Sequence, residues 1–211
     1  MLEAYRRGLF PMGDPDSGDI GWYDPDPRGV IPLEPGGFRV SRSLRAKVRQ
    51  GRFRVTSDRA FERVIRACAE PRGEDGVWIS EPIIEAYCTL RAHGYAHSVE
   101  AWVDGADGEP VLVGGLYGVA VGAAFAGESM FSRPDLGGTD ASKVCLVHLV
   151  GHLRRAGFVL LDTQFTNPHL EQFGCIEIPR DEYRWQLIGA TDCEVAWEPF
   201  EARGSVEAPV A

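Results

Sequence analysis

The run of small and apolar residues from 112 to 126, LVGGLYGVAVGAAFA, is the feature that most constrains how this chain can fold. Its composition is typical of buried, paired strands, and its glycines allow a backbone or a ligand to approach closely. The segment GESMFSR follows at residues 127–133, so the carboxylate of Glu128 lies at the end of buried β structure. Burying an ionised carboxylate costs on the order of several kcal/mol unless it is paired. We therefore expect Glu128 to pair with a positively charged group.

Patterns along the rest of the chain predict a mixed α+β fold. Capping residues and helical spacing indicate helices over 41–51, 58–70, 80–94, 139–157 and 181–189, the second with Asp58 as its N-cap. Apolar alternation or continuous apolar runs indicate strands over 96–103, 111–121, 123–132, 158–165 and 175–178. This order is typical of an acyltransferase-like domain, which we place at residues 37–197.

Proline and polar residues mark the two ends of that domain. Six of the 14 prolines lie between residues 11 and 35, a density that forbids regular helix or central strand. We therefore predict a small looped N-terminal module over residues 1–36, held by its aromatic side chains. The polar, acidic residues 198–211 predict a flexible tail.

The composition argues against several classes of protein. Five cysteines without a Cys-x-x-Cys pair disfavour a disulfide framework and a cysteine-rich zinc site, and the histidine pairs at 93/97 and 148/152 lack a third ligand. We predict no metal and no cofactor. No charge-free apolar run approaches the roughly 18 residues that cross a bilayer, and acid, base and proline interrupt the first 13 residues. We expect a cytoplasmic monomer with no membrane partner.

The net charge of −9 hides a strong asymmetry along the chain. Residues 39–66 contain ten basic and two acidic residues and carry +8, whereas the remaining chain carries −17 from 12 basic and 29 acidic residues. Such asymmetry indicates one surface for an anion and another for a cation, so a nucleic-acid partner is not excluded. A merely solvated basic helix is the alternative.

The strand expected over 158–165, FVLLDTQF, carries a carboxylate and an amide two residues apart. Alternation places Asp162 and Gln164 on one face, near the end of a strand that is apolar on both faces and hence central. The carboxylate would hold the Gln164 NH2 group and leave the amide oxygen directed outward as an acceptor. With Glu128, these groups could converge on one cationic ligand. The alternative is a polar strand end that leaves the core.

Several segments, taken in order, resemble the bacterial leucyl/phenylalanyl-tRNA–protein transferases over about residues 3 to 188. Among them are AYRRGLFPM, WYDPDPRGVIPL, GYAHSVEAW and HLEQFGCIEIPRDEY, and the most specific are LVGGLYG, GESMFSR and the D-x-Q pattern of LLDTQ. The resemblance implies a small N-terminal domain followed by a GNAT-like domain. It also implies transfer of Leu or Phe from tRNA to the N-terminal Arg or Lys of proteins, which creates an N-degron for proteolysis. Met is a further donor that a loosely selective apolar slot would admit.

The same resemblance assigns roles to individual residues. The catalytic centre would contain Glu128, Asp162 and Gln164. The apolar aminoacyl pocket would contain Leu116, Phe125, Met130, Leu146 and Leu161. The adenosine at the tRNA 3′ end would contact Trp78, Tyr5, Trp22 and Tyr23. The tRNA phosphates would be held, without reading of sequence, by Arg39, Arg42, Arg45, Lys47 and Arg49.

Two positions depart from the family pattern. Met12 stands where relatives often have tryptophan, and Asp140 stands where they usually have asparagine. In our mechanistic hypothesis, Asp162 orients Gln164, and Gln164 accepts a hydrogen bond from the attacking amine. Glu128 pairs with the cationic acceptor, which offsets the cost of burying its own charge.

Two other functions stay open at this point. A GNAT acetyltransferase using acetyl-CoA would keep the fold but needs a glycine-rich phosphate cradle, for which RPDLGGTDASK (133–143), with two aspartates, is a poor match. A non-enzymatic module that binds RNA or charged tRNA would use the basic stretch. Such a module has no use for the three polar residues together.

Overall fold

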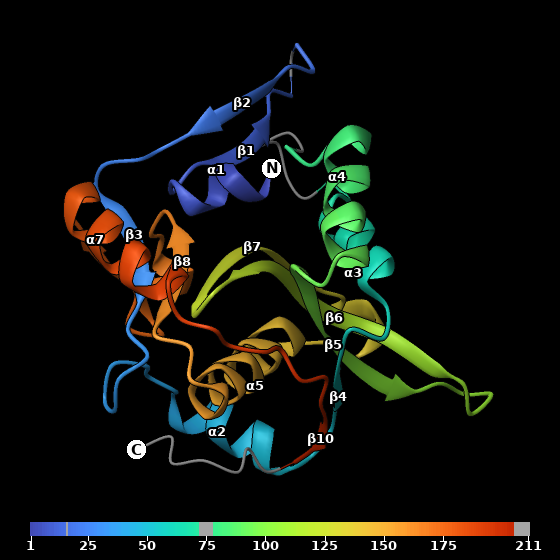
Figure 1. Cartoon of the computed structure of the whole chain (residues 1–211). Coiled ribbons are helices and arrows are strands. Elements are labelled where there is room, and N and C mark those ends of the chain that lie inside the picture. The colour runs from blue at the N-terminus through green and yellow to red at the C-terminus, as the bar shows by residue number, and fades with distance from the viewer. Residues whose placement is uncertain (16, 72–77, 205–211) are drawn as a thin grey trace.

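The computed structural model describes residues 1–15, 17–71 and 78–204 and has a mixed α+β fold built around a curved sheet (Figure 1). The neighbouring strands of this sheet are, in order, β10 (Glu201–Arg203), β4 (Arg54–Ser57), β5 (Ala96–Asp104), β6 (Pro110–Val121), β7 (Ala124–Ser132), β8 (Leu160–Gln164), β3 (Arg28–Ile31) and β9 (Ile176–Ile178). β7 and β8 run parallel, whereas the other neighbours run antiparallel.

Helices cover both faces of this sheet, with apolar cores between the layers. One core joins the sheet to α2 (Arg42–Arg49) and α5 (Ala141–Ala156). The other joins it to α1 (Leu2–Arg6), α3 (Phe61–Cys68) and α4 (Glu81–Ala92). A smaller cluster lies under α7 (Arg180–Thr191), and the short α6 (Pro168–Glu171) follows β8. None of the helices in the described ranges is long and apolar enough to cross a membrane.

The helices and strands expected from apolar spacing are confirmed, with small shifts at their ends. The expected N-cap at Asp58 is wrong, because α3 begins after Ala60 and Asp58 has a φ of +60°. Its carboxylate instead accepts a hydrogen bond from the Ser98 backbone N–H (3.0 Å) and contacts His97 Nδ1 (2.9 Å). Asp58 therefore ties the start of α3 to β5.

The N-terminal region contains more regular structure than its prolines predict. α1 precedes a hairpin of β1 (Phe10–Gly13) and β2 (Ile20–Tyr23), and β3 enters the main sheet between β8 and β9. The expectation of loops alone is therefore wrong for these segments. β3 forms despite the nearby prolines for a local reason. Arg28–Ile31 contains no proline and is buried at every position, so its backbone groups can pair with strands on both sides.

The chain end is also more ordered than expected. β10 pairs with β4, and Trp197, just before it, stacks on His97 (centroids 4.3 Å apart) and Phe125 (5.5 Å) and meets His152 (4.5 Å). The flexible-tail prediction is wrong for Glu201–Arg203, because a three-residue strand has too few side chains to form an apolar pattern. Residues 205–211 of that predicted tail lie outside the described residues.

We expect Trp197→Ala to lower the free energy of unfolding by about 2–3 kcal/mol, because it empties an aromatic cluster between β5 and α5. Denaturant unfolding measures this loss. Trp185→Ala is the matched control, since Trp185 on α7 is 82% exposed and should lose less than about 0.5 kcal/mol. Equal losses for the two variants would show that the chain end adds no packing energy.

Candidate functional site

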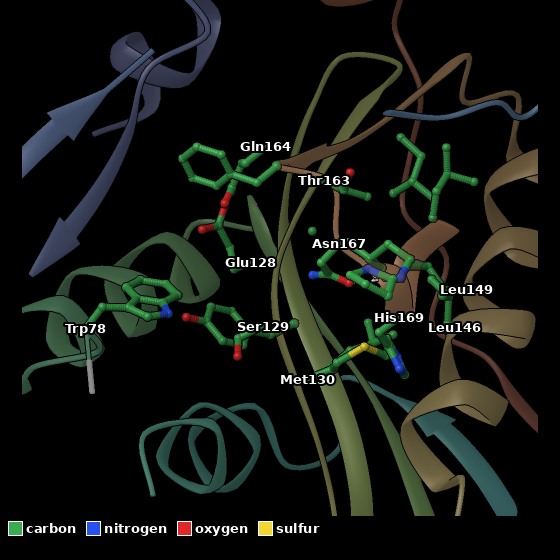
Figure 2. Close-up of a pocket in the computed structure, with 18 of the residues that line it drawn as sticks. Trp78, Glu128, Ser129, Met130, Leu146, Leu149, Thr163, Gln164, Asn167 and His169 are labelled. Carbon is green, nitrogen blue, oxygen red and sulfur yellow. Dashed lines mark hydrogen bonds between the residues drawn. The ribbon is translucent and has the colours of Figure 1, made fainter. Parts of the chain in front are cut away.

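A cavity of about 610 Å3 opens beside β6, β7 and β8 and is bounded by α5 and by the segment that leads into α6 (Figure 2). Its volume lies within the roughly 300–1,000 Å3 typical of small-molecule sites. Leucine, isoleucine and methionine side chains form much of its wall, and the carboxylate of Glu128 and the amides of Gln164 and Asn167 also face it. The site therefore combines a large apolar surface with a few polar groups.

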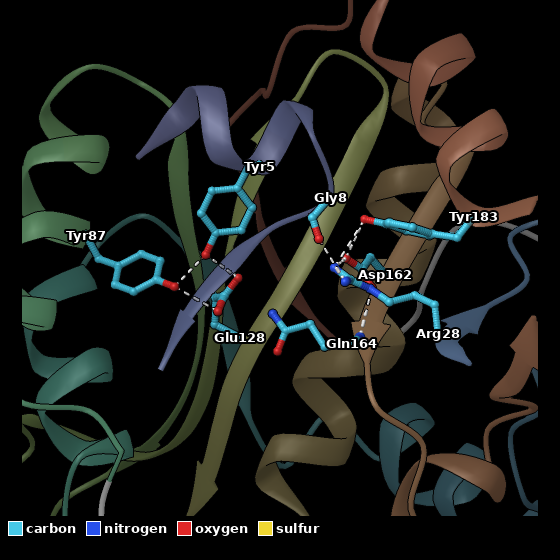
Figure 3. Close-up of polar contacts among 8 residues, drawn as sticks. All are labelled: Tyr5, Gly8, Arg28, Tyr87, Glu128, Asp162, Gln164 and Tyr183. Carbon is cyan, nitrogen blue, oxygen red and sulfur yellow. Dashed lines mark hydrogen bonds and ion pairs between the residues drawn. The ribbon is translucent and has the colours of Figure 1, made fainter. Parts of the chain in front are cut away.

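Glu128 lies in the wall of this cavity and is held by two tyrosines (Figure 3). Its Oε1 accepts a hydrogen bond from Tyr5 (2.7 Å), its Oε2 accepts one from Tyr87 (2.8 Å), and the two hydroxyl oxygens lie 2.5 Å apart. Burial raises the pKa of Glu128 to about 7; the polar groups of the two tyrosines and Gln164 oppose this rise, and the charge of Asp162 adds to it. The carboxyl therefore exchanges its proton near neutral pH.

Gln164 ends β8 in an unusual backbone conformation. Its φ is +65°, a region that residues other than glycine rarely adopt, and its backbone N–H donates to Asp162 Oδ1 (2.8 Å). The side-chain Nε2 is buried and has no well-formed hydrogen bond within the described residues. It is directed toward the Glu128 carboxylate, while the amide oxygen is turned away (Figure 3). A strained backbone that fixes a polar side chain is typical of functional sites.

Asp162 forms a buried ion pair with Arg28. The guanidinium donates to both carboxylate oxygens (2.9 and 2.6 Å), and the two side chains are 1% and 2% exposed. Tyr183 donates to the same carboxylate (2.8 Å), and Arg28 also donates to the Gly8 carbonyl (2.8 Å). Burial opposes the charge of Arg28, but the bonds to Asp162 raise its pKa above the ordinary value. This pair lies behind the main cavity, which Asp162 does not line.

The basic stretch of the sequence divides into two parts. Its second part is largely neutralised, since Arg54 and Arg59 pair with Glu201 and Arg66 pairs with Glu62 and Glu81. In the first part, Lys47 pairs with Asp140. The exposed basic residues that have no ion pair within the described ranges include Arg39, Arg42, Arg45 and Arg49, which we call the α2 surface.

Comparison with known sequences identifies the family. A family model described as leucyl/phenylalanyl-tRNA protein transferase matches residues 30–188, and a model of the N-terminal domain of the same family matches residues 1–26. The chain belongs to this family. The predicted resemblance to leucyl/phenylalanyl-tRNA–protein transferases is thus confirmed.

Three curated relatives bear the name leucyl/phenylalanyl-tRNA–protein transferase and match over most of their length. The relative from Salinibacter ruber is 48% identical over 95% of this chain and 82% of its own length. Those from Gloeobacter violaceus and Chlorobaculum parvum are 52% and 51% identical, each over 91% of its own length. The match covers 90% and 89% of this chain, respectively.

The structure places several of the predicted site residues around one cavity. Of the five residues expected in the aminoacyl pocket, four line the cavity: Leu116, Met130, Leu146 and Leu161. Phe125 does not, because its ring packs into the core against Phe158 and Trp197. That prediction is corrected, because Trp197 stacks on the Phe125 ring in the core.

The aromatic residues expected at the adenosine lie in three different places. Trp78 lines the cavity. Tyr5 is buried with its hydroxyl on Glu128, so its ring is not available for stacking. Trp22 and Tyr23 lie on β2, exposed by 50% and 41%, outside the cavity lining.

The expected pairing of Asp162 with the Gln164 side chain is wrong. Asp162 holds the Gln164 backbone N–H instead, because the positive φ at Gln164 ends the alternation and turns the two side chains apart. Sequence patterns also missed Arg28 and Tyr87. Arg28 carries one signal, a basic residue at the start of the apolar stretch RGVI, whereas Tyr87 has the spacing of an ordinary core residue.

Breaking the buried ion pair should be more damaging than removing it. We expect Arg28→Leu to cost about 3–5 kcal/mol of unfolding free energy, because it leaves the Asp162 charge buried without a partner. The double variant Arg28→Leu/Asp162→Leu should cost clearly less than the sum of the two single changes. Denaturant unfolding of the four proteins of this cycle measures the coupling, and additive losses would contradict it.

Glu128 should make stability depend on pH in a defined direction. Its folded-state pKa of about 7 lies above an unfolded value near 4.3, so the folded protein binds more protons between these values and loses stability as pH rises through them. We compare the unfolding free energy of Glu128→Gln with that of the wild type at two pH values. The variant-minus-wild-type difference should be about 3 kcal/mol more positive at pH 8 than at pH 4, because only the wild type loses the stabilising proton. A difference between the two proteins that does not change with pH would contradict this.

Proposed function

We propose that this chain transfers leucine or phenylalanine, with methionine as a further donor, from aminoacyl-tRNA to the N-terminal Arg or Lys of acceptor proteins. The product would carry an N-degron. The observation that carries the proposal is one cavity whose leucine- and methionine-rich wall adjoins the Glu128 carboxylate and the Gln164 amide. The wall suits an apolar aminoacyl group, and the carboxylate suits a cationic chain end.

The apolar wall accounts for the proposed choice of aminoacyl group. Leu116, Met130, Leu146 and Leu161 offer contacts without a fixed polar group, and a methionine side chain adapts to ligands of different shape. Such a wall discriminates one methylene by only about 1–3 kcal/mol. Leucine, phenylalanine and methionine would therefore compete, whereas charged aminoacyl groups would be rejected by the cost of desolvation.

The reaction needs alignment more than activation, because an aminoacyl ester is already reactive toward amines. Holding two reactants in the right geometry supplies roughly 7–11 kcal/mol in favourable cases. Gln164 is suited to this task, since Asp162 fixes its backbone and its buried amide nitrogen is directed toward Glu128. Arg28, which holds Asp162 through two hydrogen bonds, supports the same geometry from behind the cavity.

The α2 surface and the aromatic residues support a role in binding tRNA. Exposed arginines without acidic partners attract the phosphate backbone without reading sequence. The backbone N–H of Arg39 donates to the Phe173 carbonyl (2.9 Å), which joins this surface to the turn after α6. Trp78 in the cavity wall is placed to stack on the terminal adenosine, and Trp22 and Tyr23 offer exposed rings on the hairpin.

We further propose a GNAT-like arrangement for residues 37–197 after a small N-terminal module over 1–36, in a protein that acts as a cytoplasmic monomer. The parallel pair of β7 and β8 within an otherwise antiparallel sheet supports a GNAT-like arrangement. The charge at the start of α5, where a phosphate cradle for acetyl-CoA would lie, disfavours the acetyltransferase alternative. Asp140, at the start of α5, places a carboxylate there, already bound by Lys47 and Lys143.

The proposed activity is tested with purified protein, radiolabelled Leu-tRNA and a peptide that begins with Arg. Peptides that begin with Ala and a parallel assay with acetyl-CoA serve as controls. We expect label on the Arg peptide alone. Acetylation without aminoacyl transfer would favour the acetyltransferase, and tRNA binding without any transfer would favour the non-enzymatic module.

The α2 surface should set the salt dependence of tRNA binding. We expect Arg42→Ala/Arg45→Ala to weaken tRNA binding about 10-fold or more near physiological salt and to reduce the slope of log K against log salt by about 1.5–2, one phosphate contact per arginine. Filter binding at several salt concentrations measures both. The control is Arg54→Ala/Arg59→Ala, which removes two arginines that pair with Glu201. Equal effects of the two pairs would contradict a specific role of the α2 surface.

A further inference from the structure

The proposed transfer requires a group that takes a proton from the acceptor's α-ammonium, and two of the three polar residues are unsuited to it. Gln164 carries an amide, which donates and accepts hydrogen bonds but does not take up a proton. Asp162 does not line the main cavity. Its oxygens already accept hydrogen bonds from Arg28, Tyr183 and the Gln164 backbone. Neither residue is therefore placed to take up the proton of an incoming amine.

The contacts of Glu128 indicate a group that alternates between protonated and ionised forms. Three contacts of 2.5–2.8 Å join its carboxylate and the hydroxyls of Tyr5 and Tyr87 into a ring. Each of the three contacts needs one proton to be a hydrogen bond, and the two hydroxyls supply only two. A proton on Glu128 supplies the third. When Glu128 is ionised, both tyrosines donate to it and its charge stays solvated by hydrogen bonds.

We infer that Glu128 is the proton acceptor for the attacking amine, and that Tyr5 and Tyr87 are positioning residues that hold its carboxylate at the cavity. This inference rests on the proposed aminoacyl transfer. It assigns to Glu128 a chemical step in place of simple pairing with a cation, and to Tyr5 a role distinct from adenosine contact.

The surroundings of Glu128 match this role. Among the described residues, the titratable and polar groups that interact with it are Tyr5 from α1, Tyr87 from α4, Tyr117 from β6, and Asp162 and Gln164 from β8, and none of these is a cation. Its pKa of about 7 lies roughly one unit below that of a free α-amine, near 8. A proton therefore moves between the two groups with an equilibrium constant within about tenfold of unity.

The Glu128 carboxylate takes one proton from the ammonium, and the neutral amine nitrogen then attacks the ester carbonyl carbon. A C–N bond forms, the bond from that carbon to the ribose oxygen breaks, and a second proton from the nitrogen passes to the leaving oxygen. After the products depart, the Glu128 carboxyl releases its proton to water. The net reaction releases one proton, as aminolysis of an ester by an ammonium group requires.

The test compares wild-type protein with Glu128→Gln in single-turnover transfer from Leu-tRNA to an Arg peptide. The glutamine keeps the shape of the side chain but cannot take up a proton. We expect the rate at saturating acceptor to fall about 100-fold or more at pH 7, with the acceptor KM changing less than about 3-fold. The ratio of the two rates should shrink as pH rises from 7 to 9, because the acceptor amine then arrives already neutral.

The opposite result separates catalysis from binding. If Glu128 only binds the ammonium, Glu128→Gln will raise the acceptor KM and reach the wild-type rate at saturation, which would overturn the inference while leaving the proposed transfer intact. Absence of transfer by wild-type protein at every pH would instead reject the proposed function, and this inference with it. Glu128→Asp keeps a carboxylate and should retain the pH dependence at a lower rate. This control distinguishes loss of the titrating group in Glu128→Gln from a folding defect caused by any substitution at this position.

The two tyrosines are tested by the position of the pH–rate profile. Their hydrogen bonds lower the pKa of Glu128, so Tyr5→Phe and Tyr87→Phe should each move the acid limb of the profile to higher pH. Tyr117→Phe is the matched control, because that hydroxyl is buried without a hydrogen-bond partner in the described residues and should leave the midpoint in place. Identical profiles for all three variants would show that the tyrosines do not position a titrating carboxylate.

Discussion

The buried pair of Arg28 and Asp162 is the interaction on which the arrangement of the site depends. Arg28 comes from the N-terminal segment and Asp162 from the strand next to the cavity, 134 residues later. A charge this deeply buried persists only when paired, so each side chain fixes the position of the other's strand. The Asp162 carboxylate also holds the Gln164 backbone, and the pair therefore connects the N-terminal segment to the Gln164 amide in the cavity wall.

The two carboxylates of the site have different environments and therefore different tasks. Asp162 is enclosed by a guanidinium, a tyrosine and a backbone N–H, an environment that holds geometry. Within the described part of the chain, Glu128 interacts with neutral hydroxyls, an amide and the other carboxylate, an environment that leaves its protonation state responsive to a visiting cation. Environments that separate the behaviour of two similar groups are a general way to build acid–base chemistry.

Much of the site could be predicted from local patterns, and the remainder depended on distant contacts. A carboxylate after a buried apolar run indicated Glu128, and alternation in one strand indicated Asp162 and Gln164. Alternation failed at Gln164 because its φ of +65° leaves the strand conformation. Arg28 and Tyr87 were missed because their partners lie 134 and 41 residues away, and no period within a segment encodes such a pairing. The same holds for β10, which is recognisable only beside β4.

The last described strand also has an electrostatic consequence. Glu201 on β10 sits between Arg54 and Arg59 and cancels much of their charge. Glu201 thereby lowers the positive charge of this part of the basic stretch and weakens its attraction for a polyanion. A polypeptide that lost β10 would leave Arg54 and Arg59 without Glu201 and would present a broader cationic face. In the proposed function, a tRNA would then meet additional phosphate contacts outside the α2 surface.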